Sequence, residues 1–438
     1  METLAADPQA SVNAACPAWA DTLAAYRFFD NPKVSPEAIL QPHRDATVER
    51  IREHDVVLIL QDTTELDFTP HPPGDAGCLN TPDRFGLYDH THLAVTPQRL
   101  CLGVVGMTLF DRTPESLGQA QQRRSLPIEE KESFRWLEGF RLASELAAEV
   151  PDTQIISVAD REGDLYDIFV EAGSDPAAAD FVIRAKEQRC TPERDPDRGP
   201  AGYRLVRDEV RDSVVRLTRT VHLPQTPQRA ARQAALEVRA EPVTIKPPHA
   251  RSSLPAVHVN IVHVVEIDGP GDGTDVEWWL ITSLPVETTG DIERVIDAYV
   301  VRWVIEVYFR VLKTGCQVEE LQLETTSRVK NCLAFYKVIA WRVLSVTHLN
   351  RECPDLPCTA VFTDSEWKSV WRVTTGSELP PSAPRLGEFV KLVASLGGYN
   401  NRASDPPPGA QTLWTGIRRM TDFATAWLAF GTESNSCV

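Results

Sequence analysis

The chain has 438 residues, a length that favours two or three domains over one small core. Hydrophobic residues make up 42% and charged residues 24%, as in ordinary globular proteins, and no apolar run of about 18 residues predicts a membrane span. The first residues lack the basic and apolar segments of a secretory signal. Nine cysteines without a CxxC pair indicate the reduced thiols of a cytoplasmic protein.

The net charge of −17 counts against an ordinary nucleic-acid binder, which usually carries a basic excess. The charge is unevenly distributed along the chain. The segment 184–251 holds 15 Lys and Arg against 9 Asp and Glu, a balance of +6 that leaves −23 for the remainder. We therefore expect any contact with DNA to be local.

The expected elements follow the chain in an α/β order. Residues 1–20 are expected to be loosely structured, and Ser35, Pro36 and Glu37 form a helix-start signal. The first half then predicts strands at 56–60, 90–95 and 102–110, a loop at 114–127, a helix at 128–150, a strand at 155–159, a helix at 164–172 and a strand at 181–185. The second half predicts a loop at 187–212, β-type stretches at 213–223, 235–245, 256–267 and 277–284, and helices at 291–314, 330–349, 386–396 and 412–428.

The helix that ends at Gly315 has an unusual distribution of polar residues. At about 100° per residue, five polar-tipped side chains fall within an arc of about 80°: Tyr299, Arg302, Glu306, Arg310 and Lys313. The rest of 299–313 is apolar or aromatic, so the helix should be buried with its polar stripe facing a site. The alternative is a structural salt-bridge seam, such as a pair between Arg302 and Glu306.

Asp62 and Asp160 each follow an apolar strand, a common place for functional carboxylates in α/β folds. Taken singly, each is better explained as a turn-forming residue. Together with Glu306 they supply the oxygen ligands that Mg²⁺ or Mn²⁺ requires, and two such ions can activate a water or 3′-OH and stabilise a leaving oxygen. Asp164 is a candidate fourth acid, for which we favour a surface or capping role.

At these residues the chain resembles a known family. The spacing Y-x2-R-x3-E-x6-K within 299–313 matches the signature of the insertion-sequence-four transposase family. The flanking text AYVVRWVIEVYFRVLKTG, QDTTEL around Asp62 and VADREGD around Asp160 are similar to the transposon-five transposase branch of that family. The similarity also includes AYRFFDNPKVSPEAI, EEKESFRWL and FVIRAK, spans roughly 24–350, and is weaker at LGGY and in the last helix.

The resemblance implies a role for each matching residue. It implies that Asp62, Asp160 and Glu306 form a DDE triad that binds two Mg²⁺ or Mn²⁺ ions per active site. It also implies DNA contacts by Tyr299, Arg302 and Lys313 to terminal phosphates, by Arg184 and Lys186 on a DNA-binding strand, and by Trp278, which would stack on a flipped base with help from Trp303. Core packing is the alternative for both tryptophans.

The implied fold is α/β, with a ribonuclease-H-like catalytic core, a β-rich insertion before the last catalytic helix, and a small helical C-terminal region. The expected domains are a shortened N-terminal helical DNA-binding region at 1–50, the core at 51–186 and 285–350, the β-rich insertion at 187–284, and a helical dimerisation region at 351–438.

The implied function is cut-and-paste DNA transposition: metal-dependent strand cleavage, hairpin formation and strand transfer at transposon ends. The implied partners are double-stranded DNA, as terminal inverted repeats and target, and a second copy of the chain on that DNA. No membrane is expected, and the protein should be cytoplasmic and associated with the nucleoid when acting.

The N-terminus departs from the resemblance. Relatives have a longer helical region that grips the inverted repeats, whereas about 24 residues precede AYRF here and PQASVNAACPAWADTL contains no Lys or Arg. The alternatives are a misassigned start, a decayed copy, a truncated DNA-binding-deficient inhibitor of a full-length transposase, and a domesticated ribonuclease-H-like nuclease.

Overall fold

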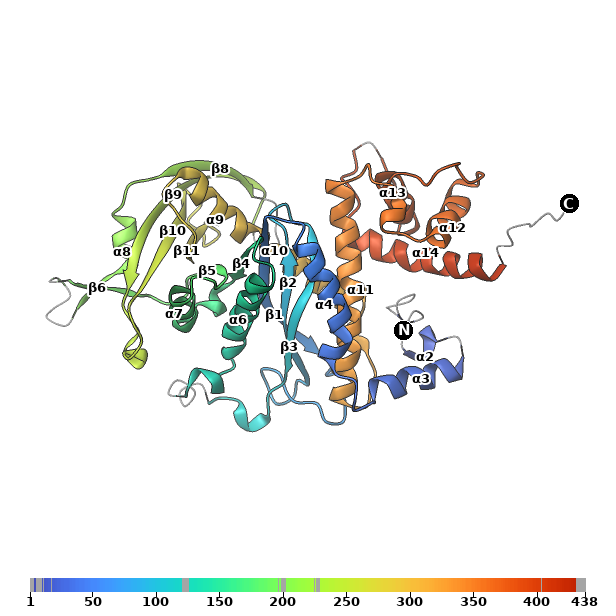
Figure 1. The fold of residues 1–438 in the computed structure, drawn as a ribbon, viewed down its shortest axis with the longest axis horizontal. Helices are drawn as coiled ribbons and strands as arrows, with labels where there is room; N and C mark the ends of the chain where they lie inside the picture. The colour runs from blue at the N-terminus through green and yellow to red at the C-terminus, as the bar shows by residue number, and fades with distance from the viewer. Residues whose placement is uncertain are drawn as a thin grey trace.

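The computed structural model describes residues 4, 10, 12–16, 18–119, 126–195, 197, 202–223, 225, 229–402 and 404–430. A sheet forms the centre of the molecule, β-rich structure continues it on one side, and a group of C-terminal helices lies on the other (Figure 1). The predicted loops 114–127 and 187–212 fall partly outside the described residues.

In the described part of the N-terminal half, helices precede an alternation of strands and helices. The helices are α2 (Val12–Ala15), α3 (Trp19–Phe29), α4 (Pro36–Ile51), α6 (Phe134–Glu149) and α7 (Tyr166–Ser174). The strands are β1 (Val56–Asp67), β2 (Gly86–Val95), β3 (Cys101–Phe110), β4 (Gln154–Ala159) and β5 (Asp180–Arg184). Short 3₁₀ turns are η1 (Pro114–Ser116), η2 (Ile128–Glu130) and η3 (Arg161–Gly163).

The C-terminal half begins with β structure and ends in helices. Its strands are β6 (Cys190–Arg194), β7 (Tyr203–Leu205), β8 (Leu217–Leu223), β9 (Arg232–Ile245), β10 (Val257–Ile267) and β11 (Glu277–Thr282). Its helices are α8 (Val206–Arg211), α9 (Thr289–Val301), α10 (Trp303–Arg310), the π-helical turn η6 (Val311–Gly315), α11 (Thr326–Glu352), α12 (Asp364–Thr375), α13 (Leu386–Leu396) and α14 (Ala410–Phe430). The 3₁₀ turns are η5 (His249–Arg251), η7 (Val318–Glu320) and η8 (Cys358–Ala360).

One mixed sheet of nine strands runs through the molecule in the order β3-β2-β1-β4-β5-β11-β10-β9-β8. Strand β1 is parallel to β4 and antiparallel to β2, and β4 is parallel to β5. The later strand β11 pairs antiparallel with β5, so the β-rich segment extends the first sheet. Only β6 and β7 form a separate pair in the described part of the chain.

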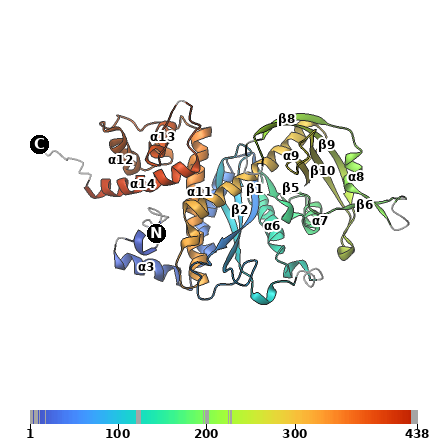
Figure 2. The same ribbon diagram turned by 180° about the vertical axis from the view of Figure 1, so that it is seen from behind.

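The alternation of β1 side chains divides the interior into two layers. Val57 and Ile59 pack with α6 and α7, whereas Leu58 and Leu60 pack with residues of α9, α10 and α11. Seen from behind, α9 and α11 lie against the sheet (Figure 2). Asp62 continues the even-numbered series, and the face that α10 covers is therefore the face on which its carboxylate lies.

Several element predictions need correction. Strand β1 runs through Asp62 to Asp67 because β2 pairs with it along that length, so Asp62 lies inside a strand and not after one. The expected helix 291–314 is divided at Arg302 and ends in a π-helical turn. The segment 187–212 contains β6, β7 and α8, and α3 begins inside the stretch 1–20 that was expected to be loose. The helix start at Ser35 is confirmed, because its hydroxyl accepts the N–H of Ala38.

Helix α11 connects the sheet to the C-terminal helices. By length and composition it could cross a membrane, but 56% of its most apolar window is buried inside the protein. The Lys337 ammonium lies 2.7 Å from both carboxylate oxygens of Asp89 on β2, and both side chains are fully buried. These contacts make α11 a core helix of the fold. The eight cysteines among the described residues are free thiols.

Candidate active site

Two neighbouring parallel strands and one crossing helix bring the three predicted carboxylates together. Leu60 of β1 is in register with Val158 of β4, and Asp62 and Asp160 each lie two residues further along. Asp160 caps η3 by accepting the N–H of Glu162 at 2.8 Å. Helix α10 brings Glu306 to the same region, near enough for its charge to act on Asp62.

Arg302 bridges two of these carboxylates. Its Nη1 lies 3.0 Å from Oδ2 of Asp62, and its Nη2 lies 2.6 Å from Oε1 of Glu306. Its side chain is only 14% exposed. The predicted polar stripe is therefore real, and the salt-bridge seam offered as its alternative is also present. The two descriptions coexist because the seam includes Asp62, which lies on a different element.

Burial is the main influence on the ionisation of Asp62. Burial raises the pKa of its carboxyl to about 6, against the lowering effect of Arg302 and with a further rise from Asp160. The other oxygen, Oδ1, accepts the N–H of Thr63 at 2.8 Å. Both oxygens of this carboxylate are thus engaged by donors of the protein itself, and yet its ionised form is still disfavoured.

The donor set suits a hard divalent cation, because Mg²⁺ and Mn²⁺ take oxygen ligands and often only a few carboxylates. Within the part of the chain that the structure describes, no three His, Cys, Asp or Glu side chains are arranged to hold an ion as they stand. Arg302 occupies the space between Asp62 and Glu306. The residue types and the partly buried carboxyl of Asp62 fit a divalent cation.

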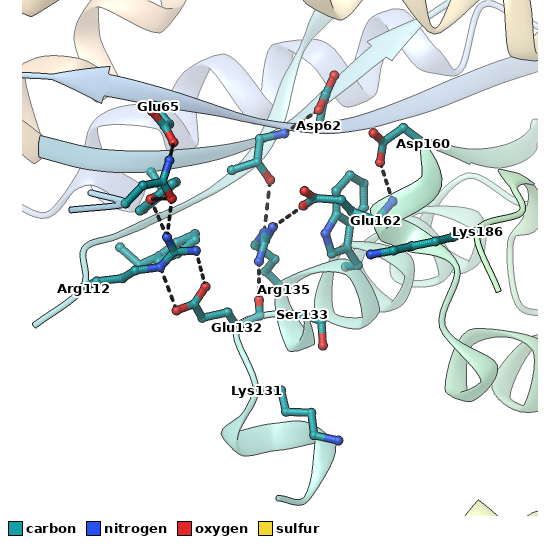
Figure 3. A pocket seen from close by; sticks show the side chains of 15 residues that line it. Asp62, Glu65, Arg112, Lys131, Glu132, Ser133, Arg135, Asp160, Glu162 and Lys186 are labelled. Carbon is teal, nitrogen blue, oxygen red and sulfur yellow. Dashed lines mark hydrogen bonds and ion pairs between the residues drawn. The ribbon is translucent and has the colours of Figure 1, made fainter. Parts of the chain in front are cut away.

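A cavity of about 810 Å³ opens beside the two aspartates (Figure 3). Lys186, exposed, lines it together with Asp62 and Asp160, whereas Tyr299, Arg302 and Glu306 are not part of its lining. Arg135 of α6 also lines it, donating to the Thr63 hydroxyl at 3.1 Å and pairing with Glu162. Sequence reasoning missed Arg135, although it lies within the EEKESFRWL segment that resembles the transposase family.

The residues expected to contact DNA differ in how far they are buried. Tyr299 is buried and packs edge-on against Trp278, with ring centroids 5.3 Å apart, and burial raises the pKa of its hydroxyl. Arg184 donates to Tyr299 and, at 3.1 Å, to the carbonyl of Glu277. Trp303 is 56% exposed, so the alternative of core packing is wrong for it, and Trp278 is half-buried.

At the far end of the polar stripe, Lys313 is held within the protein. Its ammonium donates to the carbonyl of Glu65 at 2.9 Å and pairs with Glu319 at 3.0 Å. Arg310 is exposed. Lys313, like Arg302, is thus a positively charged side chain that already has partners within the protein.

Asp164 has a buried structural position, which corrects the expectation of a surface or capping role. Its Oδ2 accepts the backbone N–H groups of Lys186 at 2.7 Å and Glu187 at 2.8 Å, and its Oδ1 pairs with the buried Arg189. The side chain of Asp164 is fully buried. It ties the turn that carries Asp160 to the strand end that carries Lys186.

Part of the positive charge of the basic segment 184–251 is paired with acids in the described part of the chain. Its arginines form ion pairs with nearby acids, several of them outside the segment: Arg189–Asp164, Arg204–Asp212, Arg211–Glu277, Arg219–Asp297, Arg232–Glu266, Arg239–Glu237 and Arg251–Asp167. The local excess of basic residues is thus partly neutralised in the fold, and Lys186 lines the cavity, where it can meet an anionic ligand.

Comparison with protein families gives two matches, one at each end of the chain. The family described as "Transposase Tn5 dimerisation domain" matches residues 338–431, and the family described as "Transposase DNA-binding" matches residues 1–34. These matches support a Tn5-like transposase. The C-terminal match includes α12, α13 and α14, and the N-terminal match includes α2 and α3.

The N-terminal match bears on the alternative of a DNA-binding-deficient inhibitor. The segment without Lys or Arg lies within the residues matched by the DNA-binding family, and so that alternative is not favoured. Among solved structures, the chain is similar to a piggyBac transposase synaptic complex with hairpin DNA at 9% identity and a TM-score of 0.34. That alignment covers 95% of this chain and 61% of the other.

Proposed function

We propose that this protein is a cut-and-paste DNA transposase whose catalytic residues are Asp62, Asp160 and Glu306. The observation that carries the proposal is their convergence from β1, from the end of the parallel strand β4, and from helix α10, which begins more than two hundred residues after β1 ends. The two transposase family matches support the same class of reaction.

We further propose that the core is ribonuclease-H-like. The strand order β3-β2-β1-β4-β5, in which β2 is antiparallel and β4 and β5 are parallel to β1, supports this arrangement. The β-rich segment would then be an insertion that extends the core sheet through β11 before the helix that carries Glu306. The YREK spacing of the insertion-sequence-four family extends from α9 through α10 into η6.

Asp62, Asp160 and Glu306 would hold two Mg²⁺ or Mn²⁺ ions, which when bound activate the attacking oxygen and stabilise the leaving one. Water then cleaves one strand at the transposon end. The freed 3′-OH attacks the opposite strand to form a hairpin, the hairpin is opened, and the 3′-OH joins target DNA. Each hydrolytic step breaks a phosphodiester bond with water. Each attack by a 3′-OH forms one phosphodiester bond as it breaks another.

The remaining site residues would bind and orient the DNA. The positively charged side chains of Arg302 and Lys313 lie on the same helix face as Glu306, where they can contact the phosphates that flank the reacting bond. Trp278 offers an aromatic ring beside Tyr299 on which an extruded base can stack. Arg184 fixes the backbone at Glu277 next to Trp278, and Lys186 faces the cavity beside the two aspartates.

The proposed partners are the terminal inverted repeats and the target duplex, bound by a dimer of this chain. The dimerisation family match and the exposed Leu428 and Phe430 at the end of α14 support a dimer through the C-terminal helices. We propose a cytoplasmic protein that acts at the nucleoid.

The proposal is tested on a plasmid that carries the inverted repeats bounding the gene. Wild-type protein should release the element in the presence of Mg²⁺, and Asp62→Ala, Asp160→Ala and Glu306→Ala should each abolish first-strand cleavage while circular dichroism shows an intact fold. Glu293→Ala, an exposed acid on α9, is the matched control and should cleave normally. Retained cleavage by any one of the three variants would remove that residue from the triad.

A further inference from the structure

The same guanidinium that stabilises the acidic site also occupies it. Arg302 contacts Oδ2 of Asp62 at 3.0 Å and Oε1 of Glu306 at 2.6 Å. The other Asp62 oxygen accepts the N–H of Thr63. One oxygen of each carboxylate is already at hydrogen-bonding distance from Arg302, so a divalent ion bound between those two oxygens would take the place of the guanidinium. The cation and the arginine therefore compete for one position.

The backbone at Arg302 is a local irregularity in an otherwise buried helix. The helix is divided there into α9 and α10. The N–H of Arg302 bonds to the carbonyl of Tyr299 at 3.1 Å, and the N–H of Ile305 bonds to the carbonyl of Arg302 at 3.1 Å, so both are i to i+3 bonds. A short 3₁₀ stretch inside an α-helix often marks a functional hinge. The residue that fills the acidic site thus lies at a break in its helix.

We propose that Arg302 is an internal counter-ion that keeps divalent cations out of the acidic site until DNA arrives, and that its guanidinium then moves to a phosphate, so that metal and DNA bind cooperatively. This inference rests on the proposed function, because it takes Asp62 and Glu306 as ligands of the ion. It adds to that function an order of events and a residue that enforces the order.

The exchange is chemically balanced. Before DNA binds, the carboxylates of Asp62 and Glu306 share one guanidinium; afterwards, divalent cations neutralise the carboxylates and the guanidinium neutralises a phosphate. Arginine suits this transfer because its planar fork pairs with carboxylate and phosphate in the same bidentate manner. The Tyr299 ring lies 5.9 Å from the Arg302 guanidinium carbon, so an aromatic face is near the released side chain. Coupling of this kind is reciprocal, since DNA must favour metal as much as metal favours DNA.

The test is binding of Mn²⁺ alone to the full chain, measured by the electron paramagnetic resonance signal of the free ion, with no activity readout. Arg302→Gln removes the competing cation and should bind Mn²⁺ about tenfold more tightly than wild type, the change expected for about 1.4 kcal/mol of lost competition. Arg310→Gln, an exposed arginine on the same helix, is the matched control and should match wild type. Adding Glu306→Gln to Arg302→Gln should remove the gain.

A second titration includes a saturating blunt duplex of arbitrary sequence, with the duplex alone as the blank. Wild-type affinity for Mn²⁺ should rise towards that of Arg302→Gln, and the variant's own affinity should change little. If Arg302→Gln does not fold, Arg302→Lys provides the test. Lysine lacks the planar fork whose two nitrogens contact the two carboxylates, so a partial gain in Mn²⁺ affinity is expected.

The outcomes separate this inference from the proposed function. Equal Mn²⁺ affinities for wild type and Arg302→Gln would overturn the role of Arg302 and leave the metal site standing. Absence of Mn²⁺ binding in every variant, with and without duplex, would overturn the metal site and this inference together. Weaker binding by Arg302→Gln would show that Arg302 organises the carboxylates for the ion, which is the opposite of what we propose.

Discussion

The buried pair of Lys337 and Asp89 gives the sharpest stability prediction. Lys337→Met leaves a fully buried carboxylate whose cationic partner at 2.7 Å is gone. Loss of one partner of a buried pair costs about 3–5 kcal/mol, whereas replacement of both by apolar residues is often neutral or stabilising. Burial lowers the pKa of Lys337, and Asp89 opposes that shift, so the charged lysine depends on this one carboxylate.

A double-mutant cycle measures the effect. The free energy of unfolding is determined by denaturant titration for wild type, Lys337→Met, Asp89→Leu and the double variant. We expect each single variant to lose about 3–5 kcal/mol and the double variant to recover most of one loss. The exposed pair Arg385–Asp355 is the control and should show little coupling. Additive losses at Lys337 and Asp89 would refute the reasoning.

Three further predictions concern single side chains. Asp164→Asn leaves the buried Arg189 without its counter-charge and should lower the free energy of unfolding by about 3 kcal/mol in denaturant titrations. Burial lowers the pKa of His43 to about 4, and its Nε2 accepts the Val104 N–H, so its stabilising effect is complete above the unfolded pKa of about 6.5 and is lost as pH falls from there towards 4. His43→Gln should therefore flatten the fall in melting temperature between those pH values. Trp278→Ala should slow hairpin formation about tenfold more than first-strand nicking, as resolved on denaturing gels.

Each of these has a control and a contrary result. Asp167→Asn breaks a more exposed pair with Arg251 and should cost less than Asp164→Asn, so equal losses would contradict the burial argument. His71→Gln, at an exposed position, should keep the wild-type pH profile, and an unchanged profile for His43→Gln would remove His43 as its cause. Equal slowing of nicking and hairpin formation by Trp278→Ala would contradict the base-stacking role.

Local signals in the sequence predicted most of the strands and helices. The helix 386–396 is α13 itself, and the Ser35 start is confirmed by a cap hydrogen bond. Helix α12 was missed although Thr363 and Glu366 form a capping box, a signal that the sequence does carry. Asp160 lies directly after β4, as its apolar strand predicted.

Partners from distant segments could not be predicted in the same way. The length of β1, and with it the position of Asp62 inside a strand, depends on pairing with β2. The periodicity of α10 predicts that Arg302 and Glu306 share a face, but the contact of Arg302 with Asp62 joins residues from two elements. The buried ion pair of Asp164 with Arg189 likewise follows from tertiary packing, because nothing in the sequence VADREGD distinguishes a buried aspartate from one that caps a helix.

The most direct test of the catalytic assignment is metal rescue of Asp160→Cys in cleavage of a repeat-bearing duplex. Mg²⁺ is a hard ion that prefers oxygen, whereas softer divalent ions accept a thiolate ligand. If the Asp160 side chain contacts the metal, the cysteine variant should be inactive with Mg²⁺ and should regain cleavage with Mn²⁺ or Cd²⁺, while Asp160→Ala should stay inactive with each ion. Full activity of Asp160→Cys with Mg²⁺, or equal behaviour of the cysteine and alanine variants with the softer ions, would contradict the assignment.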